Sequence, residues 1–151
     1  MKSFFIQIKG VVQGVGFRPF VYTLALKYDI KGWVNNDEKG VNILLYACEE
    51  NIRKFINELK SNPPILAKID SINIEEITEI KEYKTFEIIQ SESSKNKSTI
   101  ISPDIAICDD CLKDINDMSN FRYNYSLTNC TNCGPRYSII KTVPYDRINT
   151  S

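Results

Sequence analysis

The first ninety residues alternate between two spacings of apolar side chains. Phe4, Ile6 and Ile8 are separated by polar positions, which is the alternation of a half-buried strand. Over 17–28 and again over 52–59, apolar residues recur every three or four positions and predict two amphipathic helices. Further strands are expected at 32–34, 41–48, 69–77 and 86–89.

These elements follow one another in the order βαββαβ. That order predicts an α+β fold, a ferredoxin-like sandwich in which two helices cover one face of a mostly antiparallel sheet. The polar stretch 36–40 reads as a hairpin turn between the second and third strands. The same patterns divide the chain into a domain at 1–90, a serine-rich linker at 91–103 and a second module at 104–151.

Composition narrows the chemistry that the chain can perform. Histidine is absent, which excludes Ser-His-Asp and Cys-His catalysis as well as histidine-ligated zinc. Lys plus Arg and Asp plus Glu both total 19, so net charge indicates neither a nucleic-acid nor a membrane partner. No apolar run approaches the roughly 18 residues of a membrane span, and the apolar start of 1–7 is broken too early for a signal peptide. A cytoplasmic location is expected.

A glycine-rich segment lies where the first strand gives way to the first helix. Gly14 and Gly16 allow the backbone to bend so that the unpaired N–H groups of the helix converge on an anion. Arg18 adds a planar fork for phosphate oxygens, and Pro19 suits a first helical turn. From the residues alone, an ordinary tight turn with a solvated arginine remains an alternative. The candidate phosphate-binding loop comprises Gln13, Gly14, Val15, Gly16, Phe17 and Arg18.

The second module contains four of the five cysteines. Cys108 and Cys111 form one Cys-x-x-Cys pair, and Cys130 and Cys133 form another, a spacing typical of a structural four-thiolate zinc site. Disulfides and a redox pair are the alternatives, and a cytoplasmic location disfavours the former. We therefore predict a small zinc-ribbon module whose metal supplies folding energy. The fifth cysteine, Cys48, is expected as a small buried residue in a strand and not as a ligand.

Zinc ribbons often bind nucleic acid, but the charge of this module argues against that use. From residue 104 onward there are five basic and six acidic residues, a poor balance for contacting a phosphate backbone. The module also contains several aromatic residues that could stack on bases. We expect them to fill its small core instead. They are Phe121, Tyr123, Tyr125, Tyr137 and Tyr145.

Two segments of the first domain resemble the signatures of acylphosphatases. The string from Gly10 to Arg18 is similar to that family's phosphate loop, and Gly32-Trp33-Val34-Asn35-Asn36 is similar to its second motif. The resemblance covers about residues 1–90. It implies hydrolysis of an acyl phosphate without a cofactor, in which Arg18 binds the phosphate and Asn36 orients the attacking water. Strand alternation places the neighbouring Asn35 on the opposite face.

The segments around the cysteines resemble the first zinc finger of the hydrogenase-maturation carbamoyltransferases (HypF). That resemblance implies carbamoyl phosphate as substrate, in the first step of making the cyanide ligand of the nickel–iron centre. It also implies further ATP-dependent and transferase domains and a carbamoyl-accepting maturation protein as partners. Since the chain stops at Ser151, we expect a fragment, a truncated product or one part of a split system. A general acylphosphatase with an appended ribbon, or a non-catalytic phosphate-docking module, are the alternatives.

Overall fold

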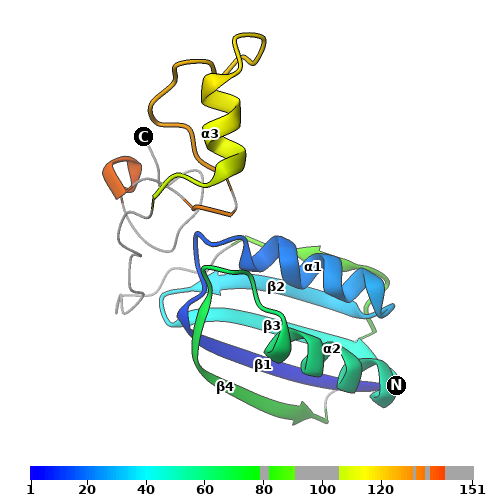
Figure 1. Ribbon diagram of the computed structural model, residues 1–151. Helices are drawn as coiled ribbons and strands as arrows, with labels where there is room; N and C mark the ends of the chain where they lie inside the picture. The colour runs from blue at the N-terminus through cyan, green and yellow to red at the C-terminus, as the bar shows by residue number, and fades with distance from the viewer. Residues whose placement is uncertain (79–81, 91–105, 131, 135–136, 142–151) are drawn as a thin grey trace.

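The computed structural model describes residues 1–78, 82–90, 106–130, 132–134 and 137–141. The expected linker at 91–103 lies outside these residues. Residues before it form a layer of helices on a sheet, and those after it form a smaller module at one end of this sandwich (Figure 1). Within the described part of the chain, no helix is both long and apolar enough to cross a bilayer.

In the described residues, five strands form one sheet with the order β4-β1-β3-β2-β5. Each pair of neighbours is antiparallel except β2 and β5, which run parallel, so the sheet is mostly antiparallel as predicted. The β2–β3 pairing continues to the tight turn at Glu38 and Lys39, so β2 is longer than the strand predicted at 32–34. The strands are β1 (Lys2–Val11), β2 (Lys31–Asp37), β3 (Gly40–Ala47), β4 (Lys68–Ile77) and β5 (Phe86–Ile88).

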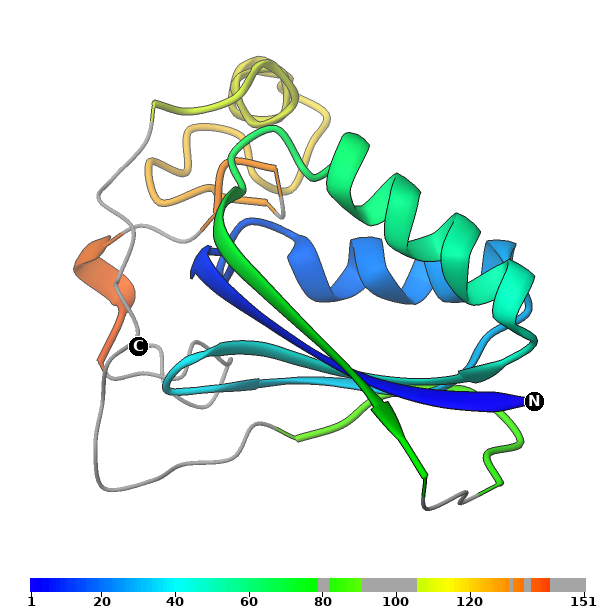
Figure 2. The same cartoon turned by 90° about the horizontal axis from the view of Figure 1, so that it is seen from below.

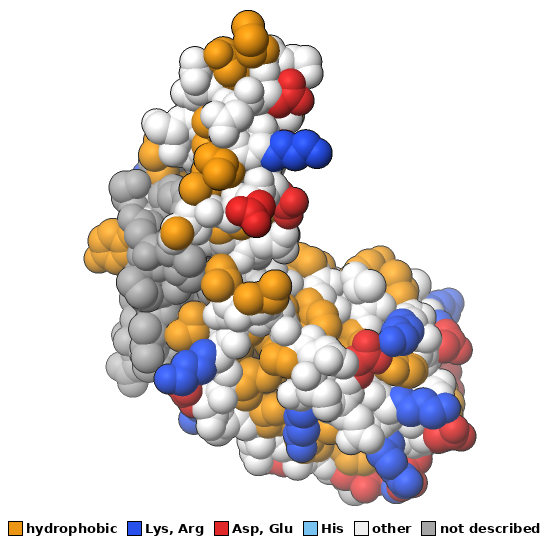
Figure 3. Space-filling model, viewed as in Figure 1, with side chains coloured by type: hydrophobic (Ala, Val, Ile, Leu, Met, Phe, Trp, Pro, Cys, Tyr) orange, Lys and Arg blue, Asp and Glu red, His pale blue; other side chains and the backbone are white. Residues whose placement is uncertain are grey.

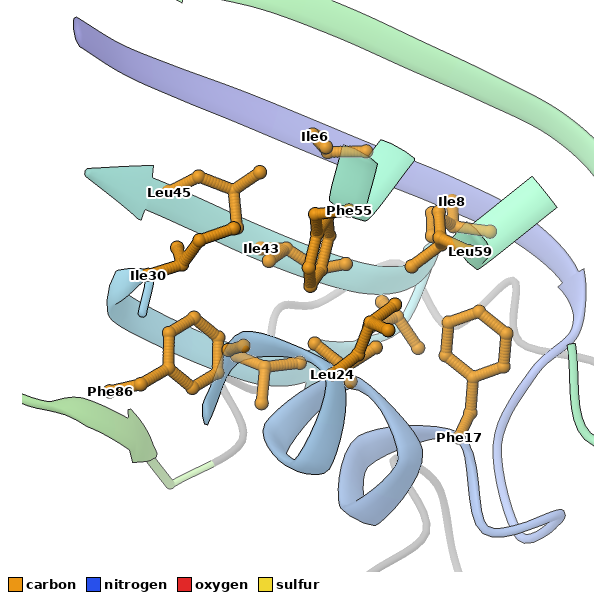
Figure 4. Packing of buried hydrophobic residues seen from close by; sticks show 14 of the residues in the cluster. Ile6, Ile8, Phe17, Leu24, Ile30, Ile43, Leu45, Phe55, Leu59 and Phe86 are labelled. Carbon is orange, nitrogen blue, oxygen red and sulfur yellow. The ribbon is translucent and has the colours of Figure 1, made fainter. Parts of the chain in front are cut away.

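Helices α1 (Phe17–Lys27) and α2 (Glu49–Ser61) lie side by side on one face of the sheet (Figure 2). The apolar side chains of the helices pack against every second residue of the central strands (Figure 4). The helical spacing and the alternating strand spacing in the sequence therefore mark the residues that form one hydrophobic core. This confirms the predicted ferredoxin-like sandwich. The fully buried side chains at this contact include Phe17, Val21, Ala25, Ile52, Phe55 and Leu59 from the helices and Ile6, Ile8, Val41, Ile43 and Leu45 from the strands.

The smaller module contains a helix that the sequence pattern does not predict, α3 (Asp109–Asn116), and a short 3-10 turn, η1 (Tyr137–Ile139). Cys108 caps α3, whose two acidic residues in the first turn favour a helix start. Asp114 of α3 accepts hydrogen bonds from Arg122 (2.9 Å) and Asn120 (3.0 Å), which fasten the following loop to the helix. At eight residues, α3 is too short for periodicity to reveal it.

Cys48 does not occupy the buried strand position that the sequence predicts. β3 ends one residue earlier, at Ala47, and Cys48 is an exposed residue at the N-terminus of α2. Its carbonyl accepts the first hydrogen bond of the helix, from Ile52 N at 3.2 Å. The expectation of burial is wrong because the chain has already turned away from the sheet at this residue.

The aromatic residues of the module do not fill a core either. Phe121 is 89% exposed, and the side chains of Tyr123, Tyr125 and Tyr137 are also exposed, so the prediction is wrong for these four. Apolar atoms gather at the outer end of the module in Figure 3. The physical reason is size: a module organised around four thiols has no interior for large rings. Tyr145 lies outside the described residues.

Candidate phosphate site and metal centre

The segment between β1 and α1 adopts the bent conformation that its glycines predict. Gly14 and Gly16 have φ of 74° and 75°, in the left-handed region that residues with a Cβ rarely enter. Gly16 is the N-cap of α1 and its carbonyl accepts from Phe20 N at 3.1 Å. The loop therefore folds back over the N-terminus of α1, where the first N–H groups have no partner within the helix.

The N-terminus of α1 differs electrostatically from those of the other two helices. α2 and α3 each begin with two acidic residues, which balance the positive end of the helix dipole. The first turn of α1, by contrast, contains no acidic residue and contains Arg18. The dipole and the guanidinium thus add to one another, and the electrostatics at this point favour an anion.

Asn36 lies beside Arg18 although the two residues come from different elements. With its amide oxygen toward the guanidinium, Asn36 accepts hydrogen bonds from Arg18 Nε at 3.1 Å and Nη2 at 3.3 Å. Strand register pairs Asn36 with Val41, whose buried side chain faces the helices, and pairs Asn35 with Asn42. Successive strand residues point to opposite faces, so Asn36 and not Asn35 joins the loop.

Gln13 has a role that its position in the loop did not reveal. Its side chain is buried, and Nε2 donates to the carbonyls of Asp37 (2.7 Å) and Gly40 (2.8 Å), at the two ends of the β2–β3 turn. The Asp37 carboxylate closes that turn by accepting from Gly40 N at 2.8 Å. Gln13 therefore fastens the loop to the hairpin that carries Asn36. Nothing in the linear sequence signals this pairing across 24 and 27 positions.

Replacing Gln13 tests this connection. In Gln13→Ala the Asp37 and Gly40 carbonyls lose this donor, one in a part-buried and one in a buried hydrogen bond, and we expect a loss of about 1–3 kcal/mol in the free energy of unfolding. Urea denaturation followed by circular dichroism measures it. The matched control is Gln7→Ala, which removes a part-buried side-chain pair with Asn42 (3.2 Å) and leaves the two Gln13 hydrogen bonds in place. Equal stability losses in the two variants would contradict the assigned role.

The loop, Arg18 and Asn36 line one cleft of about 280 Å³. Its other side comes from the second module, through Asn129, Cys130 and Gly134, which the sequence analysis did not connect with the loop. Of the lining residues that the structure describes, Arg18 is positively charged and none is a carboxylate. The cleft has the size and polarity for a phosphate group carrying a small substituent.

The four cysteines of the module converge as the spacing predicts. Their Sγ atoms all lie within 4.8 Å of one another, and Cys48 is not among them. The distance is 3.5 Å from Cys108 to Cys130, and 3.8 Å from Cys111 to Cys133. Zn–S bonds of about 2.3 Å in a tetrahedron place sulfurs about 3.8 Å apart, so these two distances are close to those of a tetrahedral zinc site.

The thiols also differ from one another in acidity. Burial raises the pKa of Cys111 well above the ordinary thiol value. Burial opposes ionisation of Cys133 too, but hydrogen bonds from the backbone of Cys130 and Cys108 outweigh it and lower the pKa of Cys133 to about 7. Cys111 and Cys133 are both buried, yet Cys133 ionises more readily, and thiolate is the form that binds metal.

Comparison with known proteins agrees with both halves of this description. The acylphosphatase family model matches residues 4–88, and the chain belongs to that family. The acylphosphatase of Listeria monocytogenes is 41% identical over 85 residues, which cover 56% of this chain and 91% of that protein. A second family model, the HypF finger, matches residues 107–140.

Both halves together are found in the carbamoyltransferase HypF, and the chain matches the N-terminal part of these proteins. A protein of Methanocaldococcus jannaschii named "Probable carbamoyltransferase HypF" is 52% identical over 145 residues, 95% of this chain and 19% of that protein. A crystal structure of full-length HypF in its phosphate- and nucleotide-bound form superimposes with a TM-score of 0.90 at 48% identity, covering 99% of this chain and 20% of that one. The chain thus spans about a fifth of the length of these relatives.

Proposed function

We propose that this chain hydrolyses acyl phosphates in the cleft between the loop and α1, and that carbamoyl phosphate is its natural substrate. The observation that carries the proposal is the meeting of Arg18, Asn36 and the uncapped N-terminus of α1 in one cleft. Family membership supports the reaction class. The finger match and the HypF relatives support carbamoyl phosphate as the particular substrate and carbamoyl transfer in hydrogenase maturation as its context.

The chemistry fits a site without a histidine. The phosphate oxygens bind to Arg18 and to the N–H groups at the start of α1, which stabilise negative charge on the phosphoryl group. Asn36 holds a water molecule in line with the bond to be broken. The water oxygen bonds to phosphorus, the bond from phosphorus to the acyl oxygen breaks, and its electron pair leaves with the carboxylate, here carbamate. Both protons of the water remain with the phosphate. Because the leaving group is good, positioning contributes more than a strong base.

Release of inorganic phosphate from acetyl phosphate and carbamoyl phosphate by the purified chain tests the proposal. We expect phosphate release above the spontaneous rate with both compounds. Binding of inorganic phosphate without turnover of either compound would favour the alternative of a docking module. Equal efficiency with both would favour a general acylphosphatase that has an appended finger.

Asn36→Ala tests the proposed position of the water. We expect kcat to fall about 10²-fold, since a misplaced nucleophile costs an enzyme rate of that order. KM changes little because Arg18 still binds the phosphate. Steady-state phosphate release measures both constants, and Asn35→Ala serves as the matched control on the opposite face of β2. A loss as large in the control as in Asn36→Ala would show that the amide acts through the fold alone.

We also propose that Cys108, Cys111, Cys130 and Cys133 bind one structural zinc ion. The fit of their spacing to a tetrahedral site and the finger match support this. With all four positions taken by sulfur, the ion holds the module together and provides no open position for substrate. We further propose the division of the chain into a domain at 1–90, a linker at 91–103 and a finger module at 104–151, and the two family matches, at 4–88 and 107–140, support it.

The partners that we propose are those of the HypF context: ATP-dependent and transferase domains of the HypF type, and a maturation protein that accepts the carbamoyl group. The relatives that match nearly the whole chain are named carbamoyltransferases, which supports this. We propose a cytoplasmic location, because thiols in a zinc cluster remain available to metal where the compartment keeps them reduced. Neither nucleic acid nor membrane is proposed as a partner.

A further inference from the structure

The outer wall of the phosphate cleft belongs to the finger. Gly134 lies against the phosphate loop so closely that a Cβ on it would be 2.4 Å from the carbonyl oxygen of Gly14. Gly134 N donates to Cys130 O at 2.8 Å, which closes the second cysteine turn. This turn therefore rests directly on the loop, and Figure 1 shows the module at the end of the sandwich where β1 passes into α1.

The first residue of this wall is Asn129, and only one of the two polar atoms of its side-chain amide is hydrogen-bonded within the described residues. Nδ2 donates to the carbonyl of Leu127 at 3.0 Å, an interaction that fixes the orientation of the side chain. Within the described part of the chain, Oδ1 makes no hydrogen bond. Asn129 is one of the residues that line the cleft, together with Arg18 and Asn36, and it is half-buried. Asn129 thus adds an amide oxygen to the residues that surround the candidate phosphate site.

Other groups in the cleft are poorly suited to accept a hydrogen bond from a substrate. Arg18 and the N–H groups of α1 are donors, and the proposed function assigns them to the phosphate. The amide oxygen of Asn36 already accepts from Arg18. The amide oxygen of Gln13 belongs to a buried side chain that is tied to the β2–β3 turn. Among the side chains of the described lining, Asn129 Oδ1 is thus a suitable acceptor for a substrate donor.

We propose that Asn129 is a specificity-determining residue, whose Oδ1 accepts a hydrogen bond from the amino group of carbamoyl phosphate. Carbamoyl phosphate carries an NH₂ group where acetyl phosphate carries a methyl group, so only the former can donate to this oxygen. The proposal rests on the proposed hydrolysis of acyl phosphates. It assigns to the finger the recognition of the acyl end, while the loop and α1 bind the phosphate end.

The test is the ratio of kcat/KM for carbamoyl phosphate to kcat/KM for acetyl phosphate, measured by phosphate release with the full chain. Wild type is expected to favour carbamoyl phosphate, and Asn129→Ala is expected to lower the ratio about tenfold, the size of one lost neutral hydrogen bond. Asn129→Asp keeps an acceptor oxygen and is expected to retain most of the preference, although its charge weakens binding of both substrates. Zinc content of each variant shows whether the finger remains folded.

Asn132→Ala is the matched control. Asn132 is an exposed asparagine of the same cysteine turn, its Nδ2 donates to Asp110 Oδ2 at 3.1 Å, and it lines a different crevice. This variant is expected to keep the wild-type ratio. An unchanged ratio in Asn129→Ala with full zinc content, or an equal change in Asn132→Ala, overturns the assignment. If wild type hydrolyses neither compound, the proposed hydrolysis itself fails, which is a separate and recognisable result.

Discussion

Arg18→Ala is expected to lower kcat/KM for acyl phosphates by about 10³-fold, the range seen when a preorganised charge-stabilising group is removed from an active site. The residue supplies the positive charge among the described lining of the cleft. It also donates to Asn36, so its loss releases the amide that we propose as the holder of the water. Both the binding of the phosphate and the alignment of the nucleophile then suffer.

The measurement is phosphate release from acetyl phosphate under conditions where spontaneous hydrolysis is subtracted. The control is Arg53→Ala on α2, which removes an equally large cation whose side chain is 71% exposed and pairs with Glu49 at 3.1 Å. Surface pairs of this kind contribute about 0–1 kcal/mol to stability. Arg53→Ala should therefore retain activity, and circular dichroism should show that both variants are folded. Retention of most activity in Arg18→Ala would remove the basis of the proposed function.

Cys111→Ser is expected to abolish tight zinc binding and unfold the finger. Cys111 is buried, and a serine hydroxyl replaces a thiolate that zinc prefers strongly. Since binding of structural zinc supplies about 10–16 kcal/mol in finger peptides, the small module is not expected to hold its structure without it. We expect zinc content to fall from about one ion per chain to well below it, and trypsin to gain access to Lys113 and Arg122.

The matched control is Cys48→Ser, because Cys48 is an exposed thiol outside the cluster. It should bind zinc as wild type does, and it separates the effect of losing a ligand from the effect of losing any cysteine. Protein purified under reducing conditions and analysed for metal gives the answer. Equal zinc content in both variants would show that these thiols do not hold the ion. Unfolding of the finger also removes the outer wall of the cleft, although Arg18 and Asn36 remain on the sandwich.

Much of the fold follows from local spacing. Ile6 and Ile8 alternate with polar residues because one face of β1 is covered by helices, and Phe55 and Leu59 recur at helical spacing because they pack on that face. Each spacing is a property of a short segment, so the sequence displays it directly. The left-handed glycines before α1 and the two Cys-x-x-Cys pairs are local in the same sense.

The predictions of burial that proved wrong concern residues whose burial depends on distant parts of the chain. Cys48 follows a strand pattern without a break, and its exposure reflects where α2 begins. Phe121 is apolar in sequence, yet no element of the small module covers it in the described structure. An apolar side chain favours burial, but the packing of the folded chain determines whether another surface is available to cover it.

The sandwich, the glycine-rich loop before α1 and the four-cysteine spacing can thus be predicted from the sequence, since each depends on neighbours along the chain. The contact of Asn36 with Arg18, by contrast, depends on tertiary packing, because it requires strand register and the Gln13 hydrogen bonds to the β2–β3 turn. The tertiary structure also brings Asn129 and Gly134 of the finger next to the loop, which lies more than a hundred residues earlier in the chain. Contacts over such separations leave no periodic signal, because they are formed by the packing of complete elements and not by the order of residues within one.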